Sequence, residues 1–317
     1  MKQTNSKKIS IIIPVYNEEE NLEWHHEKIN SFFESINQTF QIIYVNDGST
    51  DSSLLVIKKI YAKNPKTVKY ITLSRNFGKE AATSAGLSVA DGDAVVIMDG
   101  DGQHPIELVT RFIELWKEGN EVVVGIRSGN TGEGFIKKYG SVLFYKTLQF
   151  IGGKSSVPGS TDFRLIDRKV VDEFNKLTER NRVTRNLIDW LGYKRTEVPF
   201  EAAERHAGTA TYSFRKLFKL AIDGIVSHST RPLKLIAVLG LLVSTISGLG
   251  GILITFQSYI LGDPLNLSIS GSALLAIFVT FLIGIVLVCQ GLLALYIESV
   301  YYESQNRPLF VISETSE

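Results

Sequence analysis

Two long stretches without a charged side chain, residues 235–262 and 264–297, lie near the end of the chain and are separated only by Asp263. A helix needs about 20 apolar residues to cross the hydrocarbon core of a bilayer, and each stretch is longer than that. The sequence therefore predicts a two-helix C-terminal transmembrane hairpin, with helices at about 235–260 and 269–297. The alternative is a hairpin buried in a large soluble core, which rarely contains such long uncharged runs.

Basic residues lie at the outer ends of the two stretches: Lys216, Lys219, Arg231 and Lys234 precede the first, and Arg307 follows the second. The short connection around Asp263 has no basic residue. Since cationic flanks stay in the cytoplasm, we expect both termini inside and the connection around Asp263 outside. The first ten residues contain no apolar run of signal-peptide length, which predicts that the preceding domain stays on the side of synthesis. The chain is thus expected in the cytoplasmic (inner) membrane.

Small residues recur every four positions in the first stretch, at Gly240, Ser244 and Gly248. Such a row suits close helix packing, either within the hairpin or in a homo-oligomer.

Composition excludes several classes of protein. A mean hydropathy of +0.08 over 317 residues is too polar for a transporter with many spans. The net charge of +1 argues against nucleic acid as a partner bound through a basic surface. The single cysteine, Cys289, excludes a disulfide framework and a cysteine-based metal site.

Apolar, β-branched runs alternate with helix-length segments before residue 130. Strands are expected at 9–15, 41–45, 68–73, 93–98 and 121–125, with helices near 18–35, 51–62, 78–89 and 105–118. This alternation predicts an α/β domain with a Rossmann-like, mainly parallel sheet. Ligands of such sheets bind beyond the carboxyl ends of the strands. The sequence has neither the dinucleotide-binding glycine motif nor a P-loop, so another ligand-binding device is needed.

Asp99 and Asp101 flank a glycine directly after an apolar strand, with Gln103 and His104 following. Hard cations such as Mg²⁺ and Mn²⁺ prefer oxygen ligands and often share them with a diphosphate. An acidic pair alone is also common in surface turns, but its place after a buried strand favours a metal site. His104 is interpreted as a residue near a helix start rather than as a ligand.

Two other strand ends carry polar residues with two interpretations each. Asp47 could accept hydrogen bonds from a nucleobase or ribose, or belong to a helix-capping turn. Asn17 suits a helix cap, while Glu18 could face the cleft or lie in the first helical turn.

Four ordered motifs carry a resemblance to a known family: Ile-Pro-Val-Tyr-Asn-Glu (13–18), Asn-Asp-Gly-Ser-Thr-Asp (46–51), Ser-Arg-Asn-Phe-Gly-Lys (74–79) and Asp-Gly-Asp-Gly-Gln-His-Pro (99–105). The chain resembles the inverting glycosyltransferases of family 2, which have a GT-A fold. More narrowly, it is similar to the polyisoprenyl-phosphate glycosyltransferases (dolichol-phosphate mannose synthase-like). Its tail resembles that of the bacterial bactoprenol glucosyltransferases. The resemblance covers nearly the whole chain.

The resemblance implies a role for each matching residue. Nucleotide-sugar binding falls to Pro14, Tyr16, Glu18, Asp47, Lys79 and Asp99, and the metal to Asp99, Asp101 and Gln103. Asp162 matches the family's catalytic carboxylate, while Arg127, Arg205 and Ser213 match groups that bind the acceptor phosphate, the two arginines also serving in catalysis. Asn46 departs from the family pattern, because many relatives have a second aspartate there.

The chemistry limits what Asp162 has to do. A lipid phosphate monoester has a second pKa near 6, so it reaches the site mostly ionised and needs little help from a general base. We therefore expect Asp162 to orient a substrate more than to remove a proton. A purely structural alternative pairs it with Arg164 or Arg168, and Arg127 and Arg205 could equally lie on solvated loops.

Segments 135–146 and 212–225 combine aromatic and basic residues, as interfacial helices do. The first could equally be an ordinary helix packed on the sheet. We expect a cytoplasmic domain over 1–212, an interfacial helix over 213–230, two transmembrane helices within 231–300, and a cytoplasmic tail over 301–317.

The predicted activity is metal-dependent inverting transfer of a hexose, glucose from UDP-glucose, to a polyisoprenyl phosphate such as undecaprenyl phosphate. The alternatives are a GDP-mannose-dependent mannosyltransferase, a component that flips lipid-linked sugars, and an inactive nucleotide-binding scaffold. Two spans without an intramembrane charge argue against flipping, and the Asp99–Asp101 pair argues against the scaffold.

Overall fold

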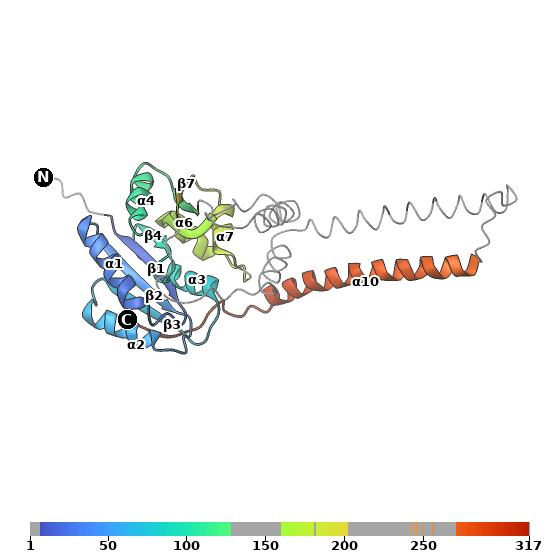
Figure 1. Cartoon of the computed structure of the whole chain (residues 1–317), viewed down its shortest axis with the longest axis horizontal. Helices are drawn as coiled ribbons and strands as arrows, with labels where there is room; N and C mark the ends of the chain where they lie inside the picture. Colours follow the sequence, from blue (N-terminus) through green and yellow to red (C-terminus); the bar gives the residue numbers. More distant parts are fainter. Residues whose placement is uncertain are drawn as a thin grey trace. The chain divides into compact units, whose positions relative to one another are not determined.

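The computed structural model describes residues 7–127, 160–180, 182–201 and 271–316, together with Leu242, Thr245, Leu249 and Phe256 (Figure 1). The chain divides into two compact units. The first contains Met1–Tyr145, Lys154–Tyr212 and Asn306–Glu317, and the second contains Lys146–Gly153 and Ser213–Gln305. The predictions for segments 135–146 and 212–225, and for Arg205 and Ser213, lie outside the described residues.

The described strands of the first unit form one sheet in the order β7-β5-β6-β4-β1-β2-β3-β8. Their bounds are β1 Ile9–Val15, β2 Phe40–Asn46, β3 Val68–Leu73, β4 Ala94–Ile97, β5 Val122–Arg127, β6 Ser160–Asp167, β7 Arg195–Phe200 and β8 Ile312–Thr315. The α/β prediction is confirmed, and all five expected strands are present with small shifts at their ends.

The sheet is mixed rather than mainly parallel. Strands β3, β2, β1 and β4 run parallel, as expected from the alternation of strands and helices. However, β6 is inserted antiparallel between β4 and β5, and β8 pairs antiparallel with β3 at the edge. Both added strands lie outside the region of regular alternation, where the sequence has no repeating pattern to reveal their direction.

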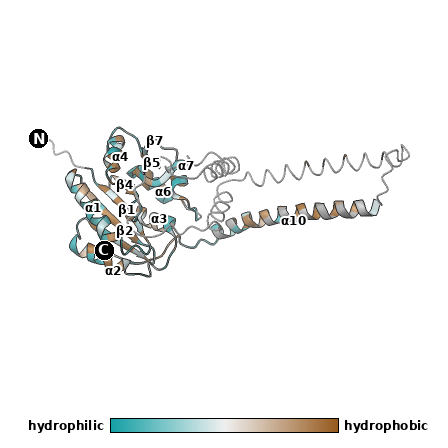
Figure 2. Ribbon diagram, viewed as in Figure 1, coloured by the Kyte–Doolittle hydropathy of each residue, from teal (hydrophilic) through white to brown (hydrophobic). Residues whose placement is uncertain are grey.

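Helices cover both faces of the sheet. Buried side chains of α1 (Leu22–Ser35), α2 (Ser53–Lys63) and α4 (Leu108–Lys117) pack in one core cluster. Those of α3 (Lys79–Val89), α6 (Arg168–Lys176) and α7 (Thr184–Trp190) pack in the other. Central strands such as β1 and β4 are therefore apolar along most of their length, as the brown ribbons of Figure 2 show.

Strand β1 shows how one strand serves both clusters. Ile11 and Ile13 belong to the cluster under α1, while Ile12 between them belongs to the cluster under α3. Helix α3 packs closely on this strand, because a Cβ added at Gly86 would lie 2.5 Å from Cγ2 of Ile12. The start of α3 is thereby held near the carboxyl end of β1.

The second unit contains α10 (Gly271–Ser304), one continuous helix of 34 residues, of which only some side chains are described. Within the described part of the chain, no helix was found that is both long and apolar enough to cross a membrane. The predicted hairpin therefore stays a prediction.

Residues beyond α10 return to the first unit. Val311 accepts a hydrogen bond from the backbone amide of Ser74 at 2.9 Å, and Ser316 donates one to the Tyr70 carbonyl at 3.1 Å. The sequence analysis expected only a tail here, because a four-residue strand with one aliphatic side chain has no recognisable period.

Candidate active site

The loops after β1 and β2 are tied together at the carboxyl edge of the sheet. Asn17 adopts a left-handed conformation with a φ of 55°, and its side-chain oxygen accepts a hydrogen bond from the Thr50 amide at 2.8 Å. The Glu18 amide donates to the Ser53 hydroxyl at 2.9 Å. Helix α1 begins only at Leu22, so Asn17 links two loops instead of capping the helix, and Glu18 precedes the first helical turn.

Asp47 holds the loop formed by residues 74–78, which leads into α3. Its two carboxylate oxygens accept hydrogen bonds from the amides of Phe77 at 2.7 Å and Gly78 at 2.9 Å. Burial raises the pKa of Asp47, and the two amide hydrogen bonds oppose that shift. In this structure Asp47 therefore braces a loop of the site, and its predicted contact with a nucleotide remains untested.

The loop after β4 carries Asp99 and Asp101. Its amides are held locally, because Asp99 donates to Nδ1 of His104 at 3.1 Å and Gln103 donates to a carboxylate oxygen of Asp101 at 3.1 Å. Gly102 has a φ of 73°, and a Cβ there would lie 2.5 Å from the Trp24 ring. The loop is thus fitted against α1 at a position that only glycine can occupy.

His104 is buried beneath this loop and contacts it through the Asp99 amide. It is 8% exposed and stacks on Phe163, with ring centroids 4.7 Å apart. Burial lowers the pKa of His104 even though Asp99 raises it, which favours the neutral ring. Since Nδ1 accepts from the Asp99 amide, the proton of the neutral ring is on Nε2. His104 precedes α4, which begins at Leu108, and its interpretation as a residue near a helix start rather than a ligand stays a prediction.

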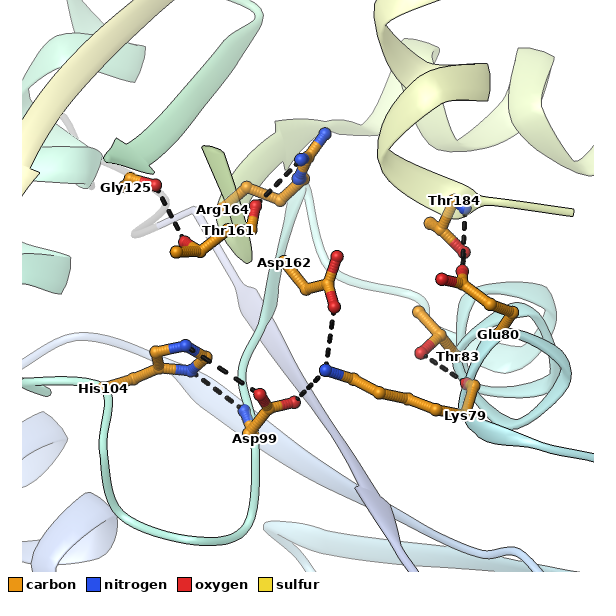
Figure 3. Close-up of polar contacts among 10 residues, drawn as sticks. All are labelled: Lys79, Glu80, Thr83, Asp99, His104, Gly125, Thr161, Asp162, Arg164 and Thr184. Atoms are coloured by element: carbon orange, nitrogen blue, oxygen red, sulfur yellow. Dashed lines mark hydrogen bonds and ion pairs between the residues drawn. The ribbon is translucent and has the colours of Figure 1, made fainter. Parts of the chain in front are cut away.

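Lys79, the first residue of α3, joins a carboxylate from the loop after β4 to one from β6. Its Nζ lies 2.5 Å from a carboxylate oxygen of Asp99 and 2.8 Å from one of Asp162. Figure 3 shows the lysine side chain reaching between the two carboxylates. Burial lowers the pKa of Lys79, but the two carboxylates raise it by more, so the amine is charged. Lys79 is thus the ion-pair partner of Asp162. Of the two arginines expected from the sequence, Arg164 lowers the pKa of Asp162, whereas Arg168 pairs with Asp172 at 3.5 Å.

Strand β6 brings Asp162 to the site. Because β6 runs antiparallel beside β4, a residue at its start lies near the carboxyl end of β4, where Asp99 follows. Burial raises the pKa of Asp162, but Lys79 and Arg185 outweigh it, and the pKa falls to about 2. One oxygen accepts from Lys79, and the other is buried without a hydrogen-bond partner among the described residues.

Glu80 is a site residue that the sequence analysis missed. Its carboxylate accepts hydrogen bonds from the Thr184 amide at 2.7 Å and the Thr184 hydroxyl at 2.5 Å, which caps α7 (Figure 3). Burial and then the charge of Asp162 raise the pKa of Glu80. The charged pair Lys79-Glu80 at a helix start was the available signal, but its partners are far away in sequence.

Two arginines act on Asp162, of which Arg164 was expected from the sequence as a structural partner and Arg185 was missed. Arg164 is 1% exposed and donates to the Thr161 carbonyl at 2.9 Å, while Arg185 on α7 faces Asp162 closely enough to lower its pKa. Glu80 therefore holds the helix that brings a positive charge to Asp162.

Three further predicted residues lie at or just beyond the carboxyl ends of β1 and β5. Pro14 pairs in register with Val45 within the sheet, Tyr16 is 45% exposed, and Arg127 is exposed at the end of β5. The structure brings together Lys79, Asp99 and Asp162 of the predicted set. Among the described residues, no group of three or more His, Cys, Asp or Glu side chains is arranged to hold a metal ion.

Comparison with known proteins identifies the family of the chain. The sequence model of glycosyl transferase family 2 matches residues 10–174. The glycosyltransferase YkcC of Bacillus subtilis (strain 168) is 37% identical over 306 residues, which cover 96% of this chain and 93% of YkcC. The SfII prophage-derived bactoprenol glucosyl transferase of Shigella flexneri is 35% identical over 308 residues, covering 97% and 98% of the two chains.

Among solved structures, glucosyl-3-phosphoglycerate synthase from Mycobacterium tuberculosis, in complex with Mn²⁺, UDP and phosphoglyceric acid, aligns with a TM-score of 0.47. The identity is 18%, over 69% of this chain and 76% of that one. The family match and the near-full-length similarity to the two bacterial proteins confirm the resemblance inferred from the motifs: the chain belongs to glycosyltransferase family 2.

Proposed function

We propose that the protein transfers a hexose, glucose from UDP-glucose, to a polyisoprenyl phosphate such as undecaprenyl phosphate, with inversion at the anomeric carbon. The observation that carries the proposal is the cluster in which Lys79 bridges Asp99 and Asp162 at the carboxyl edge of the sheet. The similarity to bactoprenol glucosyl transferases over nearly the whole length supports the choice of acceptor.

The residues after β4 fit a divalent cation, Mg²⁺ or Mn²⁺. Asp99 and Asp101 offer hard carboxylate oxygens on one loop and Gln103 an amide oxygen, the kind of donor set that leaves further positions for a substrate diphosphate. A cation bound there would neutralise the negative charge that develops on the leaving diphosphate. Lys79 adds a positive charge beside Asp99, and this charge also suits a diphosphate.

Asp162 is proposed to position a substrate. A carboxylate with a pKa near 2 is a weak base at neutral pH. The acceptor phosphate does not need a strong one, since its second pKa lies near 6. The buried oxygen of Asp162 that has no hydrogen-bond partner among the described residues suits a hydrogen bond from a sugar hydroxyl.

Acceptor binding is assigned to Arg127, Arg205 and Ser213, and donor binding to Pro14, Tyr16, Glu18 and Asp47. A guanidinium matches two phosphate oxygens at once, which is why arginine is favoured for the acceptor phosphate. Arg127 is exposed at the strand end, where a ligand has access to it.

The anchor is proposed to be the hairpin formed by the two uncharged stretches, with the interfacial helix over 213–230 before it. Strands β3 and β8 pair in one sheet, so the parts of the chain before 202 and after 305 lie on the same side of any membrane. The segment between them must then cross an even number of times, which supports two spans. The charge distribution supports a cytoplasmic location for the catalytic domain and both termini.

The test uses the purified full-length protein in lipid nanodiscs containing undecaprenyl phosphate, with UDP-glucose and GDP-mannose supplied separately as radiolabelled donors. Label should enter the lipid fraction from UDP-glucose, and EDTA should abolish the incorporation. If label enters the lipid only from GDP-mannose, the transferred sugar is mannose and not glucose. Failure with every donor sugar would contradict the proposed activity, and movement of preformed glycolipid across liposomes would favour flipping instead.

A further inference from the structure

The last residues of the chain contact the loop that leads to Lys79. Residues 310–316, here named the C-terminal clamp, contain β8, which pairs antiparallel with the second half of β3, with Ile71 opposite Thr315 and Leu73 opposite Ile312. At the far end of β3, the amide of Ser74, the first residue of the 74–78 loop, donates to the Val311 carbonyl at 2.9 Å. The clamp therefore reaches the start of this loop and not only the strand.

Side chains secure the clamp to the sheet edge. Glu314 accepts hydrogen bonds from Lys58 at 2.8 Å and from the Tyr70 hydroxyl at 2.8 Å. The Tyr61 hydroxyl donates to the Ser316 carbonyl at 3.0 Å, and the Ser313 hydroxyl donates to the Thr72 carbonyl at 3.0 Å. A segment with this many specific partners is docked in a single register.

Phe310 connects the clamp to the apolar core beneath the loop. It packs, partly buried, against the core cluster that contains Leu73 of β3 and Ala82 and Ala85 of α3. Phe77, from the middle of the 74–78 loop, packs against the same cluster. The clamp thus supports the loop through the backbone at Ser74 and through the core at Phe310.

The opposite side of the loop is held by the β2–α2 connection. Asp47 accepts hydrogen bonds from the Phe77 and Gly78 amides. A Cβ at Gly48 would lie 2.4 Å from the backbone of Arg75, so the two loops are in close contact. The 74–78 loop is therefore fixed between the β2–α2 connection and the chain terminus, and it ends at Lys79.

We propose that the C-terminal clamp is a positioning segment of the active site, which holds the 74–78 loop so that Lys79 reaches Asp99 and Asp162. The inference rests on the proposed function, because its consequence is a lower rate of glycosyl transfer when the clamp is lost. It assigns the terminal residues a part in catalysis that is separate from anchoring the enzyme to the membrane.

The experiment compares full-length enzyme in nanodiscs with three variants: deletion of residues 310–317, Phe310→Ala and Val311→Ala. The last is the matched control, because the Val311 side chain is 45% exposed and only its backbone carbonyl contacts the loop. Amide exchange of the peptide covering residues 74–79 and the kcat and KM for donor and acceptor are measured for each.

The deletion and Phe310→Ala should speed exchange of the Phe77 and Gly78 amides by about tenfold or more, as expected when a local segment opens more readily. Both should lower kcat by a similar factor with little change in KM for the lipid, while Val311→Ala behaves like wild type. Faster exchange restricted to β3, with an unchanged loop and kcat, would overturn the proposal.

If the deletion does not fold, the pair Phe310→Ala and Val311→Ala still decides the question. The exchange measurement also separates the two levels of inference. If the wild-type enzyme shows no glycosyl transfer, the proposed function is wrong. If the wild type is active but Phe310→Ala leaves amide exchange in the 74–78 loop unchanged, the positioning role of the clamp is wrong.

Discussion

One lysine determines the electrostatics of the candidate site. Lys79 contacts both Asp99 and Asp162 and is the main reason that the pKa of Asp162 falls to about 2 against the effect of burial. Its position at the first residue of α3 places the amine at the sheet edge, while the following Glu80 caps α7. Adjacent residues of opposite charge thereby organise two sides of the same site.

Replacing Lys79 by Met should lower glycosyl transfer by at least about a hundredfold, the usual scale for losing a charge that stabilises a developing anion. It should also raise the pKa of Asp162, since the largest opposing charge is removed. Lys59→Met is the control, because Lys59 lies exposed on α2. Initial rates and NMR titration of the labelled carboxylate measure the two effects. Equal rates for both variants would contradict the assignment.

The positioning role of Asp162 makes a prediction about pH. Asp162→Asn should reduce kcat, but the remaining rate should stay flat between roughly pH 7 and 9, because the acceptor phosphate is already ionised in that range. Rate profiles of wild type and variant at saturating donor provide the comparison. A steep recovery of the variant's rate at high pH would show instead that Asp162 removes a proton.

At the scale of elements, the site depends on how closely loops meet. Gly48 and Gly119 both have positive φ, 64° and 91°, but only Gly48 lies against another backbone. Strain from φ alone costs about 1–2 kcal/mol in a residue with a side chain. A Cβ at Gly48 adds a collision with the 74–78 loop, whereas a Cβ at Gly119 meets open space.

Gly48→Ala should therefore lower both the melting temperature and kcat, and Gly119→Ala should lower the melting temperature only slightly and leave kcat unchanged. Thermal unfolding followed by circular dichroism and initial rates distinguish the two. Similar losses in both variants would mean that backbone strain, and not loop contact, accounts for the effect.

Two buried histidines of helix α1 should make the stability of the fold depend on pH. Burial, followed by the charges of His104 and Lys28, lowers the pKa of His25 to about 4, and burial lowers that of His26. Since the unfolded chain has a histidine pKa near 6.5, it binds more protons than the native state between pH 6.5 and 4. The free energy of unfolding should fall as pH decreases through this window, by ~3 kcal/mol for His25.

Denaturant unfolding at pH 7 and pH 4.5 measures this loss, and His25→Gln should make the dependence on pH shallower. If the free energy of unfolding of that variant depends on pH as strongly as that of the wild type, His25 is not the cause.

The sequence predicts the elements whose patterns are local. The runs around Ile11-Ile12-Ile13 and Val95-Val96-Ile97 identify buried strands, and the polar residues after them locate the site. It does not reveal β8, or the contact between Glu80 and Thr184, which are 104 positions apart. Such contacts follow from the insertion of β6 and the packing of α7, which depend on tertiary structure and not on a local period.

On the scale of the whole molecule, the first compact unit is assembled from segments far apart in the sequence. It includes Asn306–Glu317 as well as the N-terminal residues, while α10 belongs to the other unit. Simple truncation before the uncharged stretches would therefore remove the proposed anchor and β8 together, and its effects could not be assigned to either.

A cleaner variant replaces residues 213–304 by a flexible linker and keeps residues 305–317. It should bind donor nucleotide like the full-length protein but lose most transfer to long-chain lipid in bilayers, because confinement of enzyme and acceptor to one surface acts as a high effective concentration. Calorimetric titration with UDP and initial rates in vesicles test this. Transfer as fast as in the full-length protein would mean that the uncharged stretches serve another purpose.

The pairing of β8 with β3 has a consequence for biosynthesis. Strand β3 leaves the ribosome early, yet β8 emerges only after the uncharged stretches have been made. Until β8 has been made, the nascent domain presents an unpaired edge, which is the surface through which β-proteins aggregate. A stop codon placed before residue 312 would make this edge permanent, so cellular quality control is expected to degrade the truncated chains.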